Sequence, residues 1–373
     1  MYSNFSTKKV PLLLSVLAMF AVSSYAQPGL NLGGHFIPKD SFMLFIDMGN
    51  SAMSGRTKSH DLVSEPHLWK YEVSPANHDW LPAAEPICAD AYNTTGNPKG
   101  GPIMPFLKAL HALYPTYYFG VIQLSNSGWE LSQHFLNNTK AEYDTLMKYA
   151  NVVKPNVTIA GLVSMFNTVE VQLKDTGNYL QNVSTMVSNM RSYLGSLSYM
   201  GVSYTVPYIH AGYPVLAQSN TTAQYDTSLA QTKSIMRQIS QVPGTVSNSV
   251  VIPTDGLTIC LNCDPQGYLD HYDSAGNAGW GTRTADTVFA RAWIPPMSTA
   301  VSPFQQRQLL SYNTPLMQKV LFDGTNWSVF EKAGKSFSLY SPNGKLMLGL
   351  SSSSVRRQNL TPGIYIVRPA VEK

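Results

Sequence analysis

Charged residues are scarce in this chain, because Asp, Glu, Lys and Arg together make up only 13% of its 373 residues. The net charge of +4 is unevenly spread. Residues 301–373 hold nine Lys and Arg against three Asp and Glu, whereas residues 27–300 hold fifteen against nineteen. The larger part therefore lacks the basic surface that binds nucleic acid, and no nucleic-acid partner is expected. Little charge and 21 tyrosines suit an exported protein more than a cytosolic one.

Long hydrophobic runs are absent except for one near the start of the chain. Two lysines precede residues 10–22, an apolar run that is short for a membrane span, and residues 24–26 place small side chains at a cleavage site. This pattern predicts a signal peptide over residues 1–26 and a mature start at Gln27; a retained anchor is the alternative. We expect no transmembrane segment after cleavage, and a bacterial protein that is secreted or held at the cell surface.

Cysteine is also scarce, with Cys88, Cys260 and Cys263 as the only three. Export favours one disulfide and leaves one thiol over. Either Cys260 and Cys263 form a local disulfide, or one of them forms a disulfide with Cys88. A single Cys-x-x-Cys lacks the second pair that completes a tetrahedral zinc site, so no metal is expected there.

The most informative stretch is residues 42–56, an apolar run that ends in a turn of small residues. Phe42 to Ile46 predicts a strand that is buried on both faces. Ser51 follows at the carboxyl end of that strand, where open α/β sheets bind their ligands. Its Oγ would be exposed beside free backbone amides, which suits a nucleophile. The alternative is a serine that only caps a helix.

Strands alternate with helices over the larger part of the chain. The pattern predicts strands at residues 42–46, 117–124, 157–164, 202–209 and 250–252. It predicts helices at residues 100–113, 140–153, 179–194 and 220–239, and a long loop over residues 57–101. This alternation favours a parallel sheet with helices on both faces.

The block around Ser51 resembles the first block of SGNH esterases, in particular acetylesterases of carbohydrate esterase family 6 and sialate O-acetylesterases. Their block reads Gly-Gln-Ser-Asn-Met-Ala-Gly-Arg, and this chain matches it at Gly49, Ser51, Met53, Gly55 and Arg56. Asn50 replaces Gln, and Ala52 replaces Asn. The resemblance covers roughly residues 41–292 and implies an SGNH (flavodoxin-like) α/β fold with a parallel five-stranded sheet. It also implies that Ser51 is the nucleophile, while Arg56 either shapes the site or pairs with a nearby acid.

The resemblance further implies an oxyanion hole formed by Ser51, Gly128 and Asn167. Gly128 follows the second strand at the place of the family's second glycine, with Ser127 in place of the first. An ordinary β-turn is the alternative there. Asn167 follows the third strand, close to the place of the family's oxyanion-binding amide, whereas the tryptophan and glutamate that the family carries in this block are missing.

The last block of the resemblance implies that His271 is the general base. The family's ending fits around it, with matches at Gly276, Gly281 and Arg283. Tyr268 stands where the family has its aspartate. Because a catalytic histidine needs an acceptor on its second ring nitrogen, Asp270 is the candidate acid, with other nearby groups as alternatives, namely Asp264, Asp273 or a backbone carbonyl.

A second histidine, His210, ends the fourth predicted strand and opens the sequence His-Ala-Gly-Tyr-Pro. It either borders a substrate cleft or satisfies local hydrogen bonds, and we favour the local role.

Composition shifts after residue 292. Residues 293–304 form a predicted Pro-rich linker, and residues 305–373 a predicted β-domain behind the esterase-like domain of residues 27–292. A strand, a Pro-Asn-Gly turn and a strand follow from residue 337, and the ending Pro-Gly-Ile-Tyr-Ile-Val-Arg predicts one more strand. This segment resembles the small C-terminal β-sandwich of secreted bacterial enzymes, including type IX secretion signals, which implies secretion machinery as a partner. A module that packs on the main domain or binds a surface is the alternative.

Two functions are compatible with these blocks. The first is a secreted serine esterase that removes O-acetyl groups from an acetylxylan-type or sialate-type carbohydrate, using Ser51, His271 and Asp270 and no metal or organic cofactor. The second is a catalytically impaired SGNH-fold protein that binds glycans or belongs to the cell envelope; the changed acid position and Ala52 favour it. The separation of Ser51 and His271 discriminates between the two, because a nucleophile needs its base within hydrogen-bond reach.

Overall fold

The structure, a computed structural model, describes residues 27–58, 63–73, 78–88, 99–172, 176–213, 229–260 and 271–294, and four strands between residues 318 and 369. The predicted signal peptide lies outside the described residues, as does nearly all of the predicted linker. Four residues named above also lie outside them: Cys263, Asp264, Tyr268 and Asp270.

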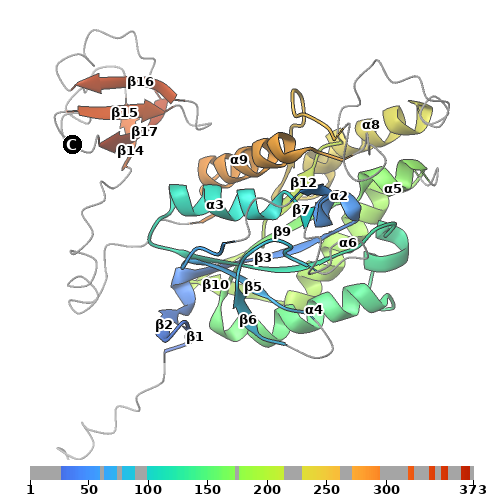
Figure 1. Ribbon diagram of the computed structural model, residues 1–373, viewed down its shortest axis with the longest axis horizontal. Coiled ribbons are helices and arrows are strands. Elements are labelled where there is room, and N and C mark those ends of the chain that lie inside the picture. Colours follow the sequence, from blue (N-terminus) through green and yellow to red (C-terminus); the bar gives the residue numbers. More distant parts are fainter. Residues whose placement is uncertain are drawn as a thin grey trace, which may run out of the picture.

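A seven-stranded sheet forms the centre of the main domain (Figure 1). Its strands lie in the order β13 (Ser249–Ile252), β12 (Tyr208–Ala211), β9 (Thr158–Met165), β3 (Phe42–Gly49), β8 (Tyr118–Ser125), β5 (Leu68–Tyr71) and β6 (Trp80–Pro82). All neighbours are parallel except β5 and β6. Numbered along the chain, the five predicted strands have the order 5-4-3-1-2, the flavodoxin-like order read from the other edge. The predicted fold class is confirmed.

Two details of the predicted sheet are wrong. The stretch 57–101 was expected to be a loop, but β5 and β6 add two strands from it. They are four and three residues long, too short for a periodic pattern to reveal. The strand expected over residues 202–209 is also interrupted, since β11 (Val202–Tyr204) pairs with β10 (Leu197–Tyr199) and only β12 joins the central sheet. Pro207 stands between β11 and β12, and proline has no N–H for a central ladder.

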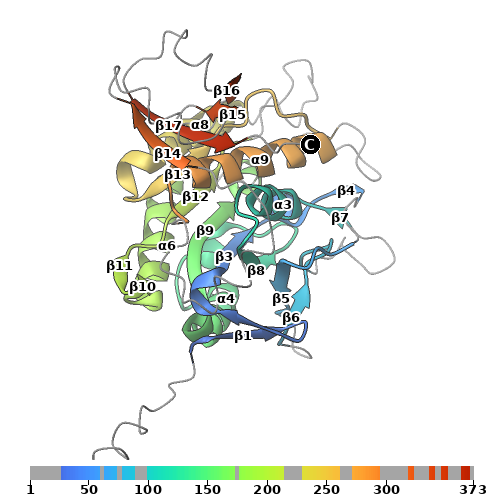
Figure 2. The same cartoon turned by 90° about the vertical axis from the view of Figure 1, so that its left-hand side faces the viewer.

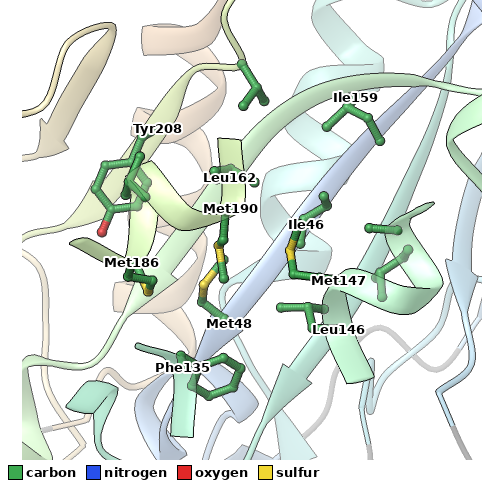
Figure 3. Packing of buried hydrophobic residues seen from close by; sticks show 14 of the residues in the cluster. Ile46, Met48, Phe135, Leu146, Met147, Ile159, Leu162, Met186, Met190 and Tyr208 are labelled. Atoms are coloured by element: carbon green, nitrogen blue, oxygen red, sulfur yellow. The ribbon is translucent and has the colours of Figure 1, made fainter. Parts of the chain in front are cut away.

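Helices cover both faces of the sheet. One face packs against α4 (Ala141–Val153), α6 (Tyr179–Leu194) and α8 (Leu229–Thr245), and Figure 3 shows part of that core. The other packs against α3 (Ile103–Leu113) and α9 (Ser274–Ala290), which lie side by side in Figures 1 and 2. β3 alternates between the two cores, with Leu44 and Ile46 in the first and Met43 and Phe45 in the second. This double burial explains its nearly continuous apolar run.

The predicted helices over residues 100–113, 140–153 and 179–194 correspond closely to α3, α4 and α6. The helix expected over residues 220–239 is described from Leu229 and continues to Thr245, while residues 220–228 lie outside the described residues. The remaining elements of the main domain are short: β1 (Gly29–Leu32), β2 (His35–Pro38), η1 (Lys39–Ser41), α2 (Ser51–Ser54), β4 (Thr57–Lys58), β7 (Lys99–Gly100), η2 (Leu131–Phe135), η3 (Lys154–Asn156) and α5 (Asn167–Gln172).

The C-terminal segment forms its own antiparallel sheet. Its strands lie in the order β14 (Gln318–Phe322), β17 (Gly363–Pro369), β15 (Ser336–Tyr340) and β16 (Leu346–Ser351). β15 and β16 are the predicted strand pair, and β17 is the predicted last strand. A second layer, which a sandwich needs, is not among the described residues of this segment, and its role as a sorting module stays a prediction. In the part of the chain that the structure describes, no helix has the length and apolarity to cross a membrane.

Candidate active site

The turn that carries Ser51 is held by its neighbour Asn50. The Asn50 Oδ1 accepts a hydrogen bond from the Ala52 backbone N–H (3.0 Å) and so caps α2. Its Nδ2 donates to the Phe166 carbonyl (2.8 Å), and its backbone N–H donates to the Met165 carbonyl (3.2 Å). These two bonds fasten the turn after β3 to the end of the neighbouring strand β9. They lie where the order of the strands reverses, which is where doubly wound sheets form their ligand crevice.

Ser51 and His271 meet at this place. The Ser51 Oγ lies 2.7 Å from the His271 Nε2, although 220 positions separate the two residues in the chain. Both side chains are buried, with 7% of Ser51 and 3% of His271 exposed. If the serine hydroxyl donates to Nε2, the imidazole can take its proton during attack on a carbonyl carbon. The distance therefore satisfies the first requirement of an activated serine nucleophile.

A short strand-like pairing positions His271. Its backbone carbonyl accepts a hydrogen bond from the Cys260 N–H (2.8 Å), and Tyr272 forms a bridge with Ile259. Directly afterwards, Asp273 caps α9, since its Oδ1 accepts from the Gly276 N–H (2.7 Å) and from the Thr258 Oγ1 (2.5 Å). The backbone of residues 271–273 is thus held against residues 258–260.

The third member of the predicted triad, Asp270, lies outside the described residues, as does its alternative Asp264. Asp273 is described, and its Oδ1 is engaged in the cap of α9. The acceptor for the His271 Nδ1 therefore stays a prediction, with Asp270 as its candidate.

Two of the predicted oxyanion residues, Gly128 and Asn167, follow the strands β8 and β9, which flank β3. Gly128 lies in the loop after β8 with a φ of +76°, a backbone conformation that favours glycine. Asn167 is the first residue of α5, directly after Phe166, whose carbonyl holds Asn50. The carboxyl ends of neighbouring parallel strands lie at one edge of a sheet, so the backbone segments of Ser51, Gly128 and Asn167 share that edge. Their oxyanion role stays a prediction, and the Asn167 side chain lies outside the description.

Arg56 braces the Ser51 turn rather than facing solvent. Only 4% of it is exposed, and its Nη1 donates to the Gly55 carbonyl (2.7 Å) and to the Ser54 Oγ (3.2 Å). Gly55 itself has a φ of +89°, and a Cβ there would lie 2.0 Å from the Gly100 carbonyl oxygen. In this chain, the family's Gly-Arg pair therefore stabilises the turn: Gly55 allows the close approach of Gly100, and Arg56 binds the backbone of the turn.

Two polar residues near the site escaped the sequence analysis. Glu170 on α5 is buried, and its Oε1 accepts from the Leu131 N–H (2.8 Å), which fastens the start of η2 in the loop after β8. Gln123 on β8 donates from its Nε2 to the Met53 carbonyl (3.2 Å) and to the Ser125 Oγ (2.9 Å). Gln123 interrupts the apolar strand β8, whereas Glu170 stands among Asn, Thr and Gln in α5 and has no such signal in the sequence.

His210 lies in β12 and does not open a loop. It is fully buried, its Nδ1 donates to the Ala211 carbonyl (2.5 Å), and its Nε2 accepts from the Tyr179 hydroxyl (2.8 Å). Burial lowers its pKa to about 4, so the ring is neutral at pH 7. The favoured local role is confirmed.

Of the two cysteines that the structure describes, Cys260 is disulfide-bonded and Cys88 is not. The Cys88 Sγ lies 3.1 Å from the Ser125 Oγ. Pairing of Cys88 with Cys260 is therefore excluded. Cys263 lies outside the described residues.

Known proteins share both the sequence pattern and the fold. The family profile "Carbohydrate esterase, sialic acid-specific acetylesterase" matches residues 41–290. A solved protein of Arabidopsis thaliana is similar with 15% identity and a TM-score of 0.51, covering 66% of this chain and 98% of its own. The solved structure of NanS is similar with 13% identity and a TM-score of 0.51, covering 68% of this chain and 98% of its own.

At these identities the two structures support the fold alone. A comparison with curated protein sequences found no match to the chain. The family match spans well over half of the chain and contains both Ser51 and His271. The chain therefore belongs to the carbohydrate esterase, sialic acid-specific acetylesterase family and is a carboxylic ester hydrolase of the carbohydrate esterase kind.

Proposed function

We propose that this protein is a secreted serine esterase that removes O-acetyl groups from a carbohydrate by a Ser–His mechanism. The observation that carries the proposal is the 2.7 Å separation of the Ser51 Oγ and the His271 Nε2 in a buried site at the carboxyl end of the central strand. The match to the family supports a carbohydrate ester as the substrate. The contact also favours an enzyme over the non-catalytic alternative, because a protein that only binds glycans does not require a serine next to a histidine.

The chemistry follows from these two residues. The Ser51 Oγ attacks the acetyl carbonyl carbon while its proton passes to the His271 Nε2, and the resulting oxyanion accepts hydrogen bonds from the Ser51 and Gly128 backbone amides and from Asn167. Collapse of this intermediate breaks the bond to the sugar oxygen, which takes the proton from His271. Water then attacks the acetyl-serine and loses a proton to the His271 Nε2. Collapse of this second intermediate breaks the bond to the Ser51 Oγ, which takes the proton back from His271, and acetate is released. Asp270 holds the second ring nitrogen in this proposal.

Hydrolysis of a chromogenic acetate ester by the mature protein and by Ser51→Ala tests the mechanism. We expect the variant to retain about 10⁻⁴ of the wild-type kcat or less, because removal of a nucleophile costs this much in serine hydrolases. Equal rates in both proteins would refute the serine mechanism. Acetylated xylan and O-acetylated sialic acid, assayed for acetate release with both proteins, then distinguish the two carbohydrate classes.

Export is part of the same proposal. The predicted signal peptide of residues 1–26 supports it, and so does the disulfide at Cys260, because disulfides persist outside the cytosol. The C-terminal β-domain would engage the secretion machinery. Mass spectrometry of the protein recovered from a bacterial culture tests export: the expected mature form starts at Gln27, and a cytosolic form that keeps residues 1–26 would contradict it.

A further inference from the structure

Two buried polar side chains lie side by side behind the Ser51 turn. Asp47 on β3 and Gln123 on β8 are partners in the register of these parallel strands. Both point to the face covered by α3 and α9, because Phe45, Val121 and the other residues in alternation with them belong to the core on that face. Neighbouring strands lie about 4.8 Å apart, so a carboxyl and an amide at paired positions are within reach of each other.

The amide group of Gln123 already serves the candidate site. Its Nε2 donates to the carbonyl of Met53, which lies two residues after Ser51 in α2. It also donates to the Oγ of Ser125, the last residue of β8, after which the chain continues to Gly128. One side-chain amide therefore contacts both the turn that carries Ser51 and the start of the predicted oxyanion loop.

The other polar atoms of this pair have no hydrogen bond of ordinary geometry in the part of the chain that the structure describes. Both carboxyl oxygens of Asp47 and the Gln123 Oε1 are buried without a hydrogen bond. On the opposite side of Asp47 the register partner in β9 is Val163, which is apolar. The Gln123 Oε1 only accepts hydrogen bonds, and a carboxyl group can donate to it only in its protonated form. Desolvation raises the pKa of Asp47 well above its usual value, which favours that form, while the Met48 backbone N–H acts in the opposite direction.

We propose that Asp47 and Gln123 act as a positioning pair for the catalytic serine: the neutral Asp47 carboxyl donates its proton to the Gln123 Oε1 and thereby directs the Gln123 Nε2 to the Met53 carbonyl. The inference rests on the proposed esterase function. A side-chain amide is nearly symmetric in shape, and without a donor at its oxygen its two ends can exchange. In the exchanged orientation an oxygen faces the Met53 carbonyl, which repels it and shifts the turn. Small displacements of a nucleophile cost a large part of the rate.

Three variants test the pair. Asp47→Val and Gln123→Met remove it, whereas Asp47→Asn keeps a donor for the Gln123 Oε1. Tyr208→Phe is the matched control, because it deletes another buried hydrogen bond (2.6 Å to the Ser164 Oγ) among residues of the opposite core. The measurements are the acylation rate constant and KM with a chromogenic acetate, and the thermal midpoint of unfolding.

We expect Asp47→Val and Gln123→Met to lower the acylation rate constant about 10- to 100-fold with KM nearly unchanged, as for a misplaced nucleophile. Asp47→Asn and Tyr208→Phe should stay close to wild type. The double variant Asp47→Val/Gln123→Met should be no slower than the slower single variant, because the two residues act as one unit. Wild-type acylation in Gln123→Met, or an Asp47→Asn variant as slow as Asp47→Val, would overturn the proposal. Should Asp47→Val fail to fold, the acylation rate constants of Gln123→Met and Asp47→Asn still test the proposal.

A readout without catalysis separates this inference from the proposed function. Amide hydrogen exchange of residues 51–56 should accelerate in Gln123→Met and stay at the wild-type rate in Asp47→Asn and Tyr208→Phe. Unchanged exchange in Gln123→Met would refute the positioning pair even if Ser51 proves to be the nucleophile. Accelerated exchange would support the pair even if Ser51→Ala keeps its activity, which would refute the serine mechanism instead.

Discussion

Ser51 is positioned by the residues around it more than by its own side chain. Asn50 ties the turn to the end of β9 by bonds to the carbonyls of Met165 and Phe166, and Arg56 holds the carbonyl of Gly55. The serine hydroxyl therefore meets the His271 ring from a fixed backbone. Such an arrangement, set before substrate binds, lowers the entropy cost of reaching the transition state.

The role of His271 as base leads to a first prediction. His271→Ala should lower kcat for a chromogenic acetate by about 10⁴-fold or more while KM changes little, because the serine loses the acceptor for its proton. Steady-state kinetics measure both parameters. His111→Ala on α3 is the matched control, since that ring stacks on His67, and it should keep the wild-type kcat. Loss of less than tenfold in His271→Ala would assign the base to another residue.

His210 leads to a second prediction, on stability against pH. Its pKa falls from 6.5 in the unfolded chain to about 4 in the folded protein, because burial disfavours the charged ring. Between these values the unfolded chain binds more protons, so stability is full above pH 6.5 and is lost as the pH falls towards 4. The loss amounts to roughly 3 kcal/mol at 1.36 kcal/mol per pKa unit.

Urea unfolding at pH 7 and at pH 4.5 measures that slope. His210→Gln removes the titrating group, so its free energy of unfolding should depend less on pH over this interval than that of the wild type. Comparison with the variant cancels the contribution of Asp47, whose raised pKa gives a slope of opposite sign. Parallel curves for the two proteins would contradict the assigned pKa.

At the site, sequence reasoning could identify residues that belong to local motifs. Ser51 and His271 each stand in a recognisable block, and the structure brings them together. Glu170 and Gln123 could not be found in this way, because their partners, the Leu131 N–H and the Met53 carbonyl, lie on other segments of the chain. Such contacts are set by strand order and loop packing, which a local pattern does not contain.

Among the elements, the start of α9 positions the candidate catalytic histidine, His271. Asp273 caps this helix and also accepts from the Thr258 Oγ1, while the His271 carbonyl accepts from the Cys260 N–H. Two segments, residues 258–260 and 271–273, are thereby joined like a pair of short strands. The position of the histidine depends on a helix cap and a backbone pairing at the same time.

The cap yields a third prediction. Asp273→Ala should lower the free energy of unfolding by about 1 kcal/mol, the usual cost of a lost N-cap. It should also reduce kcat, because the segment next to His271 loses its link to Thr258. Asp273→Asn retains a side-chain acceptor and serves as the control, with values near wild type. Thermal unfolding and steady-state kinetics test both effects, and a stable but inactive Asp273→Ala would indicate that Asp273 acts on the histidine ring itself.

For the whole molecule, the fold class followed from the alternation of apolar strands and amphipathic helices, and the central strands were located because both of their faces are buried. The strands β5 and β6, the last two at one side of the sheet, were missed. They are short, and Lys70, Leu81 and Pro82 expose part of them to solvent, so neither an apolar run nor a regular alternation marks them.

The boundary of the main domain gives the last prediction. The match to the family ends at residue 290, and the predicted boundary follows residue 292, yet Ile294 is 1% exposed and belongs to the core between the sheet, α3 and α9. A protein of residues 27–294 should therefore hydrolyse a chromogenic acetate with the kcat of residues 27–373. A protein of residues 27–292 should unfold more easily by roughly 2 to 4 kcal/mol, the usual cost of an emptied aliphatic site in a core. Urea unfolding of the two shortened proteins measures this difference. Equal stability would mean that Ile294 only covers the core, and loss of activity in residues 27–294 would show that the C-terminal sheet supports the esterase site.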